Sequence, residues 1–177
     1  MQISENGLDL IKAFEGFFAK PYRCPAGVLT QGYGHTAAAG APALGGVWTR
    51  ERATQVLRDD VTRFAAQIEP LLKRKPSQAQ YDAMLSLAYN IGPRAFAGSS
   101  VLRHFNARDD KRAAAAFGMW SKARGKVLPG LVRRRSSEAL TYQGVRDLDF
   151  DGKPDAPIFG RMPQAVASVE PKPRKAA

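Results

Sequence analysis

The sequence predicts an α+β protein, mostly α-helical, in which a small β-hairpin lobe and a helical lobe are separated by a cleft. Three observations support this prediction. Apolar residues recur at helical spacing through most of the chain, and one stretch near the N-terminus alternates as a hairpin does. In addition, 44% of the 177 residues are hydrophobic, which is enough to bury a sizeable core.

The first helix is expected over residues 5–15, because Ser4 can cap its start, Leu8 and Ile11 recur at helical spacing, and Gly16 is a natural stop. Helix starts are also marked by Thr49 and by the capping-box pattern that begins at Ser77. Further helices are therefore expected at 49–72, 78–91, 99–106, 109–123 and 131–142.

A β-hairpin is expected over residues 21–36. The chain alternates through Tyr22 and Cys24, turns at a Pro-Ala-Gly segment, and returns through Thr30. If residue 24 pairs with Val28, then residue 22 pairs with residue 30, and Cys24 and Thr30 become diagonal neighbours on one face.

Three side chains that can take part in catalysis are spaced Glu15-x8-Cys24-x5-Thr30. Each has an ordinary structural alternative when taken alone: an exposed Glu at a helix end, a small buried Cys, and a Thr that favours strands. Together, a carboxylic acid at a helix end and a reactive group and a hydroxyl on a hairpin are what glycosidic bond cleavage needs. Glu15 falls on the apolar face of its helix, where lost hydration favours the protonated form that a general acid requires.

The chain resembles the phage-type lysozymes, glycoside hydrolase family 24, over residues 1 to about 144. The family pattern places Gly-x-Gly-His directly after the Glu, Asp-or-Cys and Thr positions, and it reads here Gly32-Tyr-Gly-His35. The resemblance continues in the segments 87–92, 117–120 and 130–138. It implies a lysozyme-like fold and hydrolysis of the β-1,4 bond between N-acetylmuramic acid and N-acetylglucosamine in peptidoglycan, and no cofactor or metal.

The resemblance implies that Glu15, Cys24 and Thr30 are the catalytic residues. Many family members carry Asp where this chain has Cys24, and a thiol is mostly protonated near neutral pH. Two mechanisms remain open: the sulfur stabilises positive charge at the anomeric carbon while Thr30 holds a water, or the sulfur attacks that carbon directly.

The resemblance also implies a set of supporting residues. Tyr89 and Asn90 match positions that line the sugar groove, although Asn90 could instead cap a helix. Trp120 could stack on a sugar or belong to the core. His35 and Asp60 match a structural ion pair. The family also has an arginine that pairs with the catalytic Glu, and the matching residue here is Arg134. It belongs to a run of three arginines, of which at least one is expected to be solvated.

The formal net charge of +11 is unevenly distributed, since residues 73–135 hold fourteen basic and three acidic side chains. Such a surface fits the acidic polymer of the cell wall or an anionic outer membrane. Nucleic acid is not expected as a partner, because no zinc-ligand set or aromatic RNA-binding motif accompanies the charge. A catalytically weak wall-binding or membrane-disrupting protein is the alternative function.

The N-terminus has no signal-like segment and no apolar run reaches the eighteen or so residues of a membrane span. We therefore expect a monomeric enzyme made in the host cytoplasm, which reaches the wall through a phage holin. The single cysteine excludes an internal disulfide.

Residues 1–144 are expected to form the lysozyme domain, with the hairpin lobe at about 16–48 and the helical lobe at about 73–144 together with the N-terminal helix. Residues 145–177 would form a tail whose last residues are disordered. Within the tail, Asp147-x-Asp-x-Asp-Gly152 is similar to the start of a calcium loop, but position twelve is Ile158 rather than Glu, so no metal site is expected.

Overall fold

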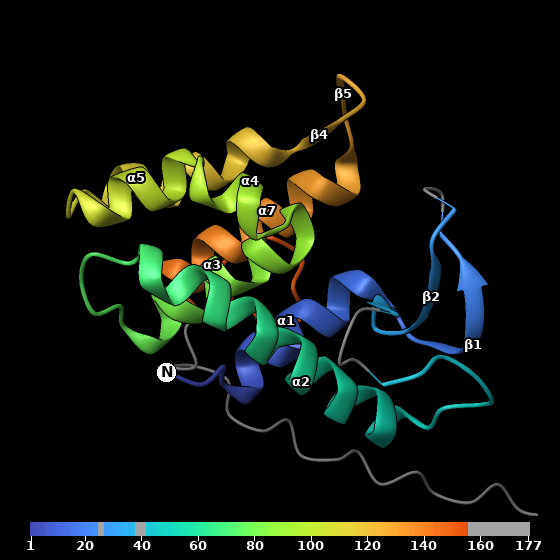
Figure 1. Cartoon of the computed structure of the whole chain (residues 1–177). Coiled ribbons are helices and arrows are strands. Elements are labelled where there is room, and N and C mark those ends of the chain that lie inside the picture. Colours follow the sequence, from blue (N-terminus) through green and yellow to red (C-terminus); the bar gives the residue numbers. More distant parts are fainter. Residues whose placement is uncertain (25–26, 38–41, 156–177) are drawn as a thin grey trace, which may run out of the picture.

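The computed structural model describes residues 1–24, 27–37 and 42–155. Helix α1 (Glu5–Glu15) leads into a three-stranded sheet of β1 (Phe18–Arg23), β2 (Leu29–Gly32) and β3 (His35–Thr36), which projects to one side of the helices (Figure 1). The remaining elements are α2 (Arg50–Ile68), the 3-10 helix η1 (Glu69–Leu71), α3 (Gln78–Ile91), α4 (Pro93–Ala97), α5 (Ser100–Asn106), α6 (Asp110–Ala116), the 3-10 helix η2 (Phe117–Trp120), β4 (Lys122–Ala123), β5 (Lys126–Val127) and α7 (Pro129–Tyr142).

The capping signals in the sequence correctly locate the helix starts. The side chain of Ser4 accepts a hydrogen bond from the Gly7 amide at the start of α1, and Thr49 caps α2 in the same way. At α3 the capping box is complete, since Ser77 and Gln80 bond reciprocally through side chain and backbone. These local bonds satisfy amides that would otherwise lack partners.

The predicted hairpin register is confirmed. β1 pairs antiparallel with β2 so that Tyr22 faces Thr30, and the Cys24 amide donates to the Val28 carbonyl at 3.0 Å. β2 continues into β3, which makes the unit three-stranded, in the order β1-β2-β3. The tight turn between β2 and β3 depends on Gly34, whose φ of 87° is unfavourable for residues with a side chain.

The prediction of one helix over 109–123 is wrong in its second half. Helix α6 ends at Ala116, η2 follows, and residues 122–127 form the β4–β5 hairpin. Its turn has positive φ at both Arg124 (50°) and Gly125 (77°), the pattern of a type I′ turn, which matches the twist of paired strands. An Arg-Gly turn between two-residue strands leaves too little alternation for the sequence to reveal it.

One other predicted helix ends early, and one short helix was not predicted. Helix α2 stops at Ile68 and tightens into η1, because Pro70 has no N–H to continue an α-helical ladder. The predicted end of α3 at residue 91 is confirmed, but the chain then begins the short helix α4, with Pro93 at its first position.

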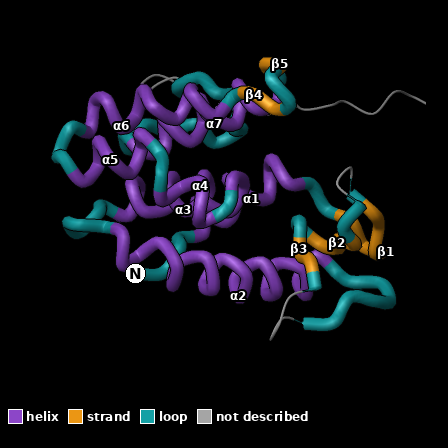
Figure 2. The backbone as a smooth tube through the Cα atoms, turned by 45° about the horizontal axis from the view of Figure 1, so that its top comes forward, coloured by secondary structure: helices purple, strands orange, loops and turns teal. Residues whose placement is uncertain are grey.

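Helix α3 forms the centre of the helical lobe and lies between α2 and α7 (Figure 2). Its middle is buried all round, with Met84, Leu85 and Leu87 fully inaccessible. Helix α1 also packs on α3, so the residue that ends α1 is held by the core rather than by a loop. Among the described residues, no helix combines the length and apolar character needed to cross a membrane.

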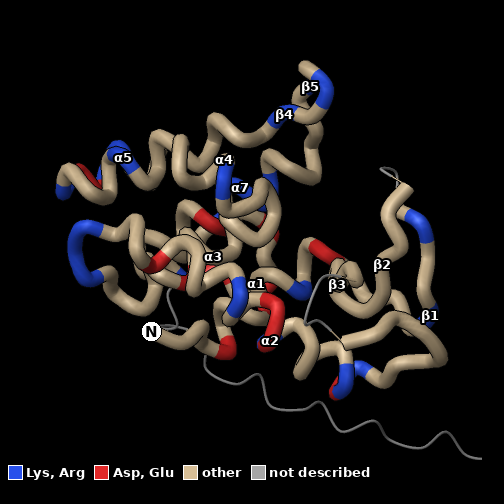
Figure 3. The backbone as a smooth tube through the Cα atoms, viewed as in Figure 1, with Lys and Arg blue, Asp and Glu red and all other residues tan. Residues whose placement is uncertain are grey.

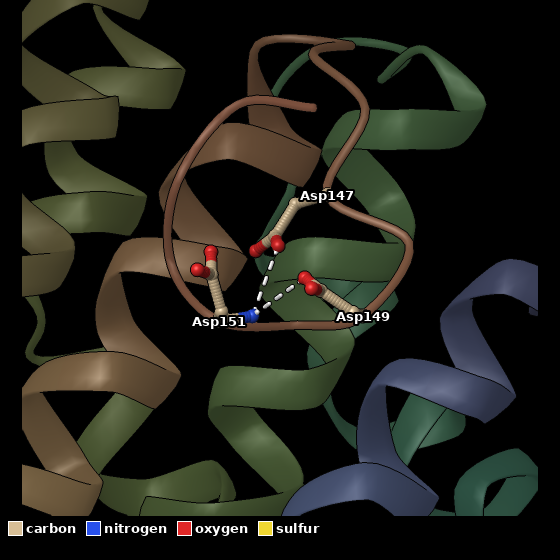
Figure 4. A group of neighbouring side chains, drawn as sticks. All are labelled: Asp147, Asp149 and Asp151. Carbon is tan, nitrogen blue, oxygen red and sulfur yellow. Dashed lines mark hydrogen bonds between the residues drawn. The ribbon is translucent and has the colours of Figure 1, made fainter. Parts of the chain in front are cut away.

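After α7 the chain forms a tight acidic loop (Figure 4). Asp147 is buried and accepts hydrogen bonds from the amides of Asp151 (3.0 Å) and Gly152 (3.2 Å), and Asp149 accepts a second bond from the Asp151 amide. Gly152 lies against Ser136 of α7, where a Cβ would meet the serine Cβ at 2.9 Å. Ile158 and the rest of the tail, including the end expected to be disordered, lie outside the described residues.

Candidate active site

The carboxylate of Glu15 lies at the C-terminal end of α1, where the chain turns away at Gly16 with a φ of 70°. Its side chain is 20% exposed and accepts a hydrogen bond from Arg134 Nη1 at 2.6 Å. The expected pair between Glu15 and the second arginine of the run is therefore present. The neighbouring Arg133 is exposed, as expected for at least one of the three.

Arg134 bridges the Glu15 carboxylate and the protein interior. Its Nε donates to Glu138 Oε1 at 3.1 Å, and only 3% of its side chain is exposed. Burial acts to lower its pKa, but the carboxylates of Glu138 and Glu15 outweigh burial and raise the pKa. Arg134 is thus a permanent cation that fixes the Glu15 side chain.

Glu138 is the buried anchor of this charged cluster. Ser86 Oγ donates to its Oε1 at 2.8 Å, and Arg135 Nε lies 3.0 Å from its Oε2. Burial raises the pKa of Glu138, and its arginine and serine partners act against burial. Neither Glu138 nor Arg135 was predicted as a site residue. The position of Glu138, three residues after Arg135 and four after Arg134 on one helix, is the signal that could have found both.

Glu15 opens onto a cavity of about 190 Å³. Tyr89 and Asn90 of α3, which were expected in the sugar groove, both line this cavity. Residues from the sheet and from α2 line it as well. Its lining consists of Glu15, Gly34, Thr36, Asp60, Arg63, Phe64, Tyr89 and Asn90. These four residues were not predicted to line the site: Gly34, Thr36, Arg63 and Phe64. Gly34 was noted only as part of the Gly-x-Gly-His motif, and α2 carries no motif that marks the turn with Arg63 and Phe64.

Tyr89 forms the wall opposite the sheet. Its hydroxyl donates to the Tyr33 carbonyl at 2.9 Å, which ties α3 to the β2–β3 turn. Burial raises the pKa of Tyr89, and the charges of Asp60 and Glu15 act in the same direction, so the phenol stays neutral.

Gly34 makes room for the Glu15 carboxylate. A Cβ at position 34 would lie 3.3 Å from Glu15 Oε2 and 3.6 Å from the Tyr89 hydroxyl. Any larger residue would crowd the carboxylate as well as strain the backbone. This is a physical reason for the second glycine of the Gly-x-Gly-His motif.

Cys24 and Thr30 lie at the hairpin, outside the cavity lining. Thr30 is 4% exposed, and its hydroxyl donates to the Val28 carbonyl at 3.1 Å. Cys24 is partly buried. Burial raises the pKa of Tyr22, and the charges of Cys24 and Glu15 raise it further, so this tyrosine lies within electrostatic reach of both residues.

His35 and Asp60 form the expected ion pair. His35 Nδ1 lies 2.7 Å from Asp60 Oδ2, and its Nε2 lies 3.0 Å from the Pro42 carbonyl oxygen. An ionised carboxylate and a carbonyl both accept only, so the arrangement suits an imidazolium ring with a proton on each nitrogen. Arg63 also bonds to Asp60.

Trp120 does not line the cavity. Its side chain is partly buried and packs against the hydrophobic core, in agreement with the structural alternative. Asn90 is not a helix cap either, because α3 ends at Gly92, whose amide donates to the Ala88 carbonyl.

A cluster of three aspartates outside the cavity has the kind of side chains that bind metal ions. Among the described residues, the carboxylates of Asp147, Asp149 and Asp151 have ligand oxygens within 4.8 Å of one another. All three side chains instead accept hydrogen bonds from backbone amides of their own loop, and Figure 4 draws the two that the Asp151 amide donates.

A carboxylic acid held by a buried arginine at a cavity between a small sheet and a helical lobe defines a lysozyme-type glycoside hydrolase. The comparisons agree. The sequence model described as phage lysozyme matches residues 12–138. The endolysin of Acyrthosiphon pisum secondary endosymbiont phage 1 is 44% identical over 149 residues, which cover 82% of this chain and 100% of the relative.

Two solved structures have the same fold. A variant of P22 lysozyme is 38% identical, with a TM-score of 0.72, and the match covers 81% of this chain and 99% of that one. The muramidase domain of SpmX from Asticaccaulis excentricus is 36% identical, with a TM-score of 0.72, and the match covers 80% of this chain and 97% of that one. The chain belongs to the phage lysozyme family. It is a glycoside hydrolase with muramidase endolysin function, and the weak wall-binding alternative is not favoured.

Proposed function

We propose that Glu15 is the general acid of this muramidase and protonates the glycosidic oxygen between N-acetylmuramic acid and N-acetylglucosamine. The supporting observation is the placement of its carboxyl in a cavity, fixed by Arg134 and faced by Tyr89 and Asn90. The proton passes to the leaving oxygen as the bond to the anomeric carbon breaks. A water adds to that carbon, and the proton that this water loses passes to bulk solvent.

Thr30 is the residue that positions the water in this proposal. Its only proton is used in the bond to the Val28 carbonyl, so its oxygen offers lone pairs to a water hydrogen. Cys24 supports positive charge at the anomeric carbon, or attacks it through sulfur. NMR of the first-formed anomer separates the two, because a single attack by water inverts the configuration and attack by sulfur followed by water retains it. We favour inversion, because it gives Thr30 a direct role.

Clearing of purified cell walls tests the acid assignment. The wild-type enzyme should clear a wall suspension, and Glu15→Gln should fail to do so while it remains folded. Asp9→Asn is a matched control, since Asp9 is exposed on the same helix, forms an ion pair with Lys12 and does not line the cavity. Clearing by Glu15→Gln at a rate near that of the control would assign the acid to another residue.

We also propose that the basic surface brings the enzyme to the anionic wall or to an anionic outer membrane. Lys and Arg gather on the loop before α3 and on the β4–β5 hairpin (Figure 3). The chain has no Asp or Glu from residue 111 to residue 137, and the whole hairpin is exposed. No acidic side chain near the hairpin in sequence neutralises its charges, so they act at range in dilute salt.

The route to the wall is a further part of the proposal. A monomer made in the host cytoplasm would pass a membrane pore formed by a phage holin. Cytoplasmic expression with and without a pore-forming protein tests this route, because lysis should require the pore. Lysis at the same time without any pore would contradict it.

A further inference from the structure

We propose that Arg135 is a positioning residue that turns the Asn90 amide so that its N–H group faces the cavity. The site then takes a hydrogen-bond acceptor of the substrate, and we infer that this acceptor is the carbonyl oxygen of a 2-acetamido group. The inference rests on the proposed function, because it concerns the sugar bound beside Glu15.

The guanidinium of Arg135 is held rigidly. Its side chain is 1% exposed, its Nε lies 3.0 Å from Glu138 Oε2, and its Nη2 donates to Glu138 Oε1 at 3.2 Å. The same Nη2 donates to Asn90 Oδ1 at 3.0 Å. Burial lowers the pKa of Arg135 and Glu138 opposes this, but an arginine keeps its charge in proteins. The bond to Asn90 therefore comes from a fixed cation.

The chemistry of the two groups decides which way the amide faces. A guanidinium donates and never accepts, so the oxygen of Asn90 must face Arg135 and the NH₂ group must face away. Asn90 is exposed and lines the cavity that contains Glu15. The NH₂ group is thus offered as a donor, and the cation behind the amide polarises its N–H bonds.

The acetamido carbonyl is the acceptor that this donor would distinguish best. Sugar hydroxyls both donate and accept, so they can satisfy an amide in either orientation. A carbonyl only accepts, and both sugars of the wall polymer carry one. A fixed N–H donor therefore favours a group that can only accept. If the Asn90 amide were reversed, its oxygen would face the acetamido carbonyl oxygen and repel it.

Two wall substrates test the inference: N-acetylated peptidoglycan and the same material after chemical de-N-acetylation. The readout is the ratio of kcat/KM on the two substrates. Wild type should prefer the acetylated wall, and the hydrogen bond alone should account for about a threefold to tenfold preference. That part should appear in KM more than in kcat, because the bond already forms in the bound substrate.

Asn90→Asp keeps the oxygens but lacks the donor, so the preference should fall by the same factor. Arg135→Lys should also lower it, because a single ammonium cannot bond Glu138 and fix the amide at once. Arg133→Lys, at an exposed neighbour, is the control and should keep the wild-type ratio. An Asp at position 90 could also pair with the free amine of the treated wall, so Asn90→Ala, which lacks the donor and adds no charge, must lower the ratio as well.

An unchanged ratio in Asn90→Ala, or in folded Arg135→Lys, would overturn the inference. Should Arg135→Lys fail to fold, the Asn90→Ala ratio decides. Failure of the proposed function would show differently, as full activity of Glu15→Gln on untreated wall whatever the ratio.

Discussion

Arg134 donates to Glu15 at 2.6 Å, although the two residues lie 119 positions apart in the chain. The ion pair joins the end of α1 to the first half of α7. It also leaves Arg134 partnered if the Glu15 charge is removed, because Glu138 remains bonded to its Nε. The site should therefore tolerate changes at Glu15 that abolish its chemistry.

Glu15→Gln should fold with a Tm equal to or above that of wild type and lose about 10²–10⁴ in rate, the usual value of general acid catalysis. The Gln amide oxygen can still accept from Arg134 but the side chain has no proton to deliver. Differential scanning fluorimetry and wall clearing measure the two effects. Activity within threefold of wild type would refute the assignment.

Cys24→Ala should be severely impaired, whereas Cys24→Asp should keep much of the wild-type rate. An aspartate can provide negative charge beside the anomeric carbon, and alanine provides none. Iodoacetamide should inactivate the wild type with the addition of one mass increment, since the chain has a single thiol. Treated Cys24→Ala serves as the blank. A fully active alkylated enzyme would assign Cys24 a structural role.

The rate of wall clearing should fall steeply between 0.01 M and 0.15 M salt, as the Debye length shrinks from about 30 Å to about 8 Å. Hydrolysis of neutral chitooligosaccharides should barely change. Replacement of Lys122 and Lys126 by Gln should flatten the salt dependence on walls, and Lys20→Gln on β1 is a single-charge control. Equal salt dependence on both substrates would argue against electrostatic attraction.

Asp60→Asn should destabilise the fold by about 3 kcal/mol, the lower end for a broken buried ion pair, because His35 and Arg63 would both lose the carboxylate that they contact. Asp59→Asn is the matched control. Asp59 is the residue before Asp60, and its carboxylate accepts a hydrogen bond only from the side chain of exposed Gln55 among the described residues. Urea unfolding of both variants gives the comparison. Equal midpoints would show that the pair contributes little.

Asp110→Asn should change how the thermal stability of the protein depends on pH. Burial acts to raise the pKa of Asp110, but hydrogen bonds from Tyr142 and Arg74 outweigh it and lower the pKa below the ordinary 3.8. A carboxyl whose pKa is lower in the folded protein stabilises the fold at pH values above its pKa in the unfolded chain. This stability is lost as the pH falls through the pKa in the folded protein. The variant should thus have a lower Tm than wild type at pH 6, with the gap closing by about pH 2–3. A gap that stays constant would contradict this linkage.

Local signals explain what could be predicted from the sequence. Ser77 and Gln80 bond within one turn, and Gly92 ends the same helix through its own backbone, so α3 could be located from neighbouring residues alone. The spacing of Glu15 and Arg134 gave no such information, and their pairing had to be expected from the family resemblance. Arg63 and Phe64 enter the cavity only because α2 packs beside the sheet, a tertiary fact that no short motif encodes.

The β4–β5 hairpin was missed for a different reason. Its strands have two residues each, and its turn depends on a positive φ at Arg124, a residue type that seldom adopts it. The surrounding alanines favour a helix, so local propensity pointed the wrong way.

The bond between Arg134 and Glu15 also sets when the enzyme can begin to work. The acid is among the first residues to leave the ribosome and its cationic partner is among the last of the family domain to be made. A nascent chain that ends before α7 contains the acid and the hairpin but not the arginine that orients them. Assembly of the site therefore waits until synthesis of the domain is nearly complete.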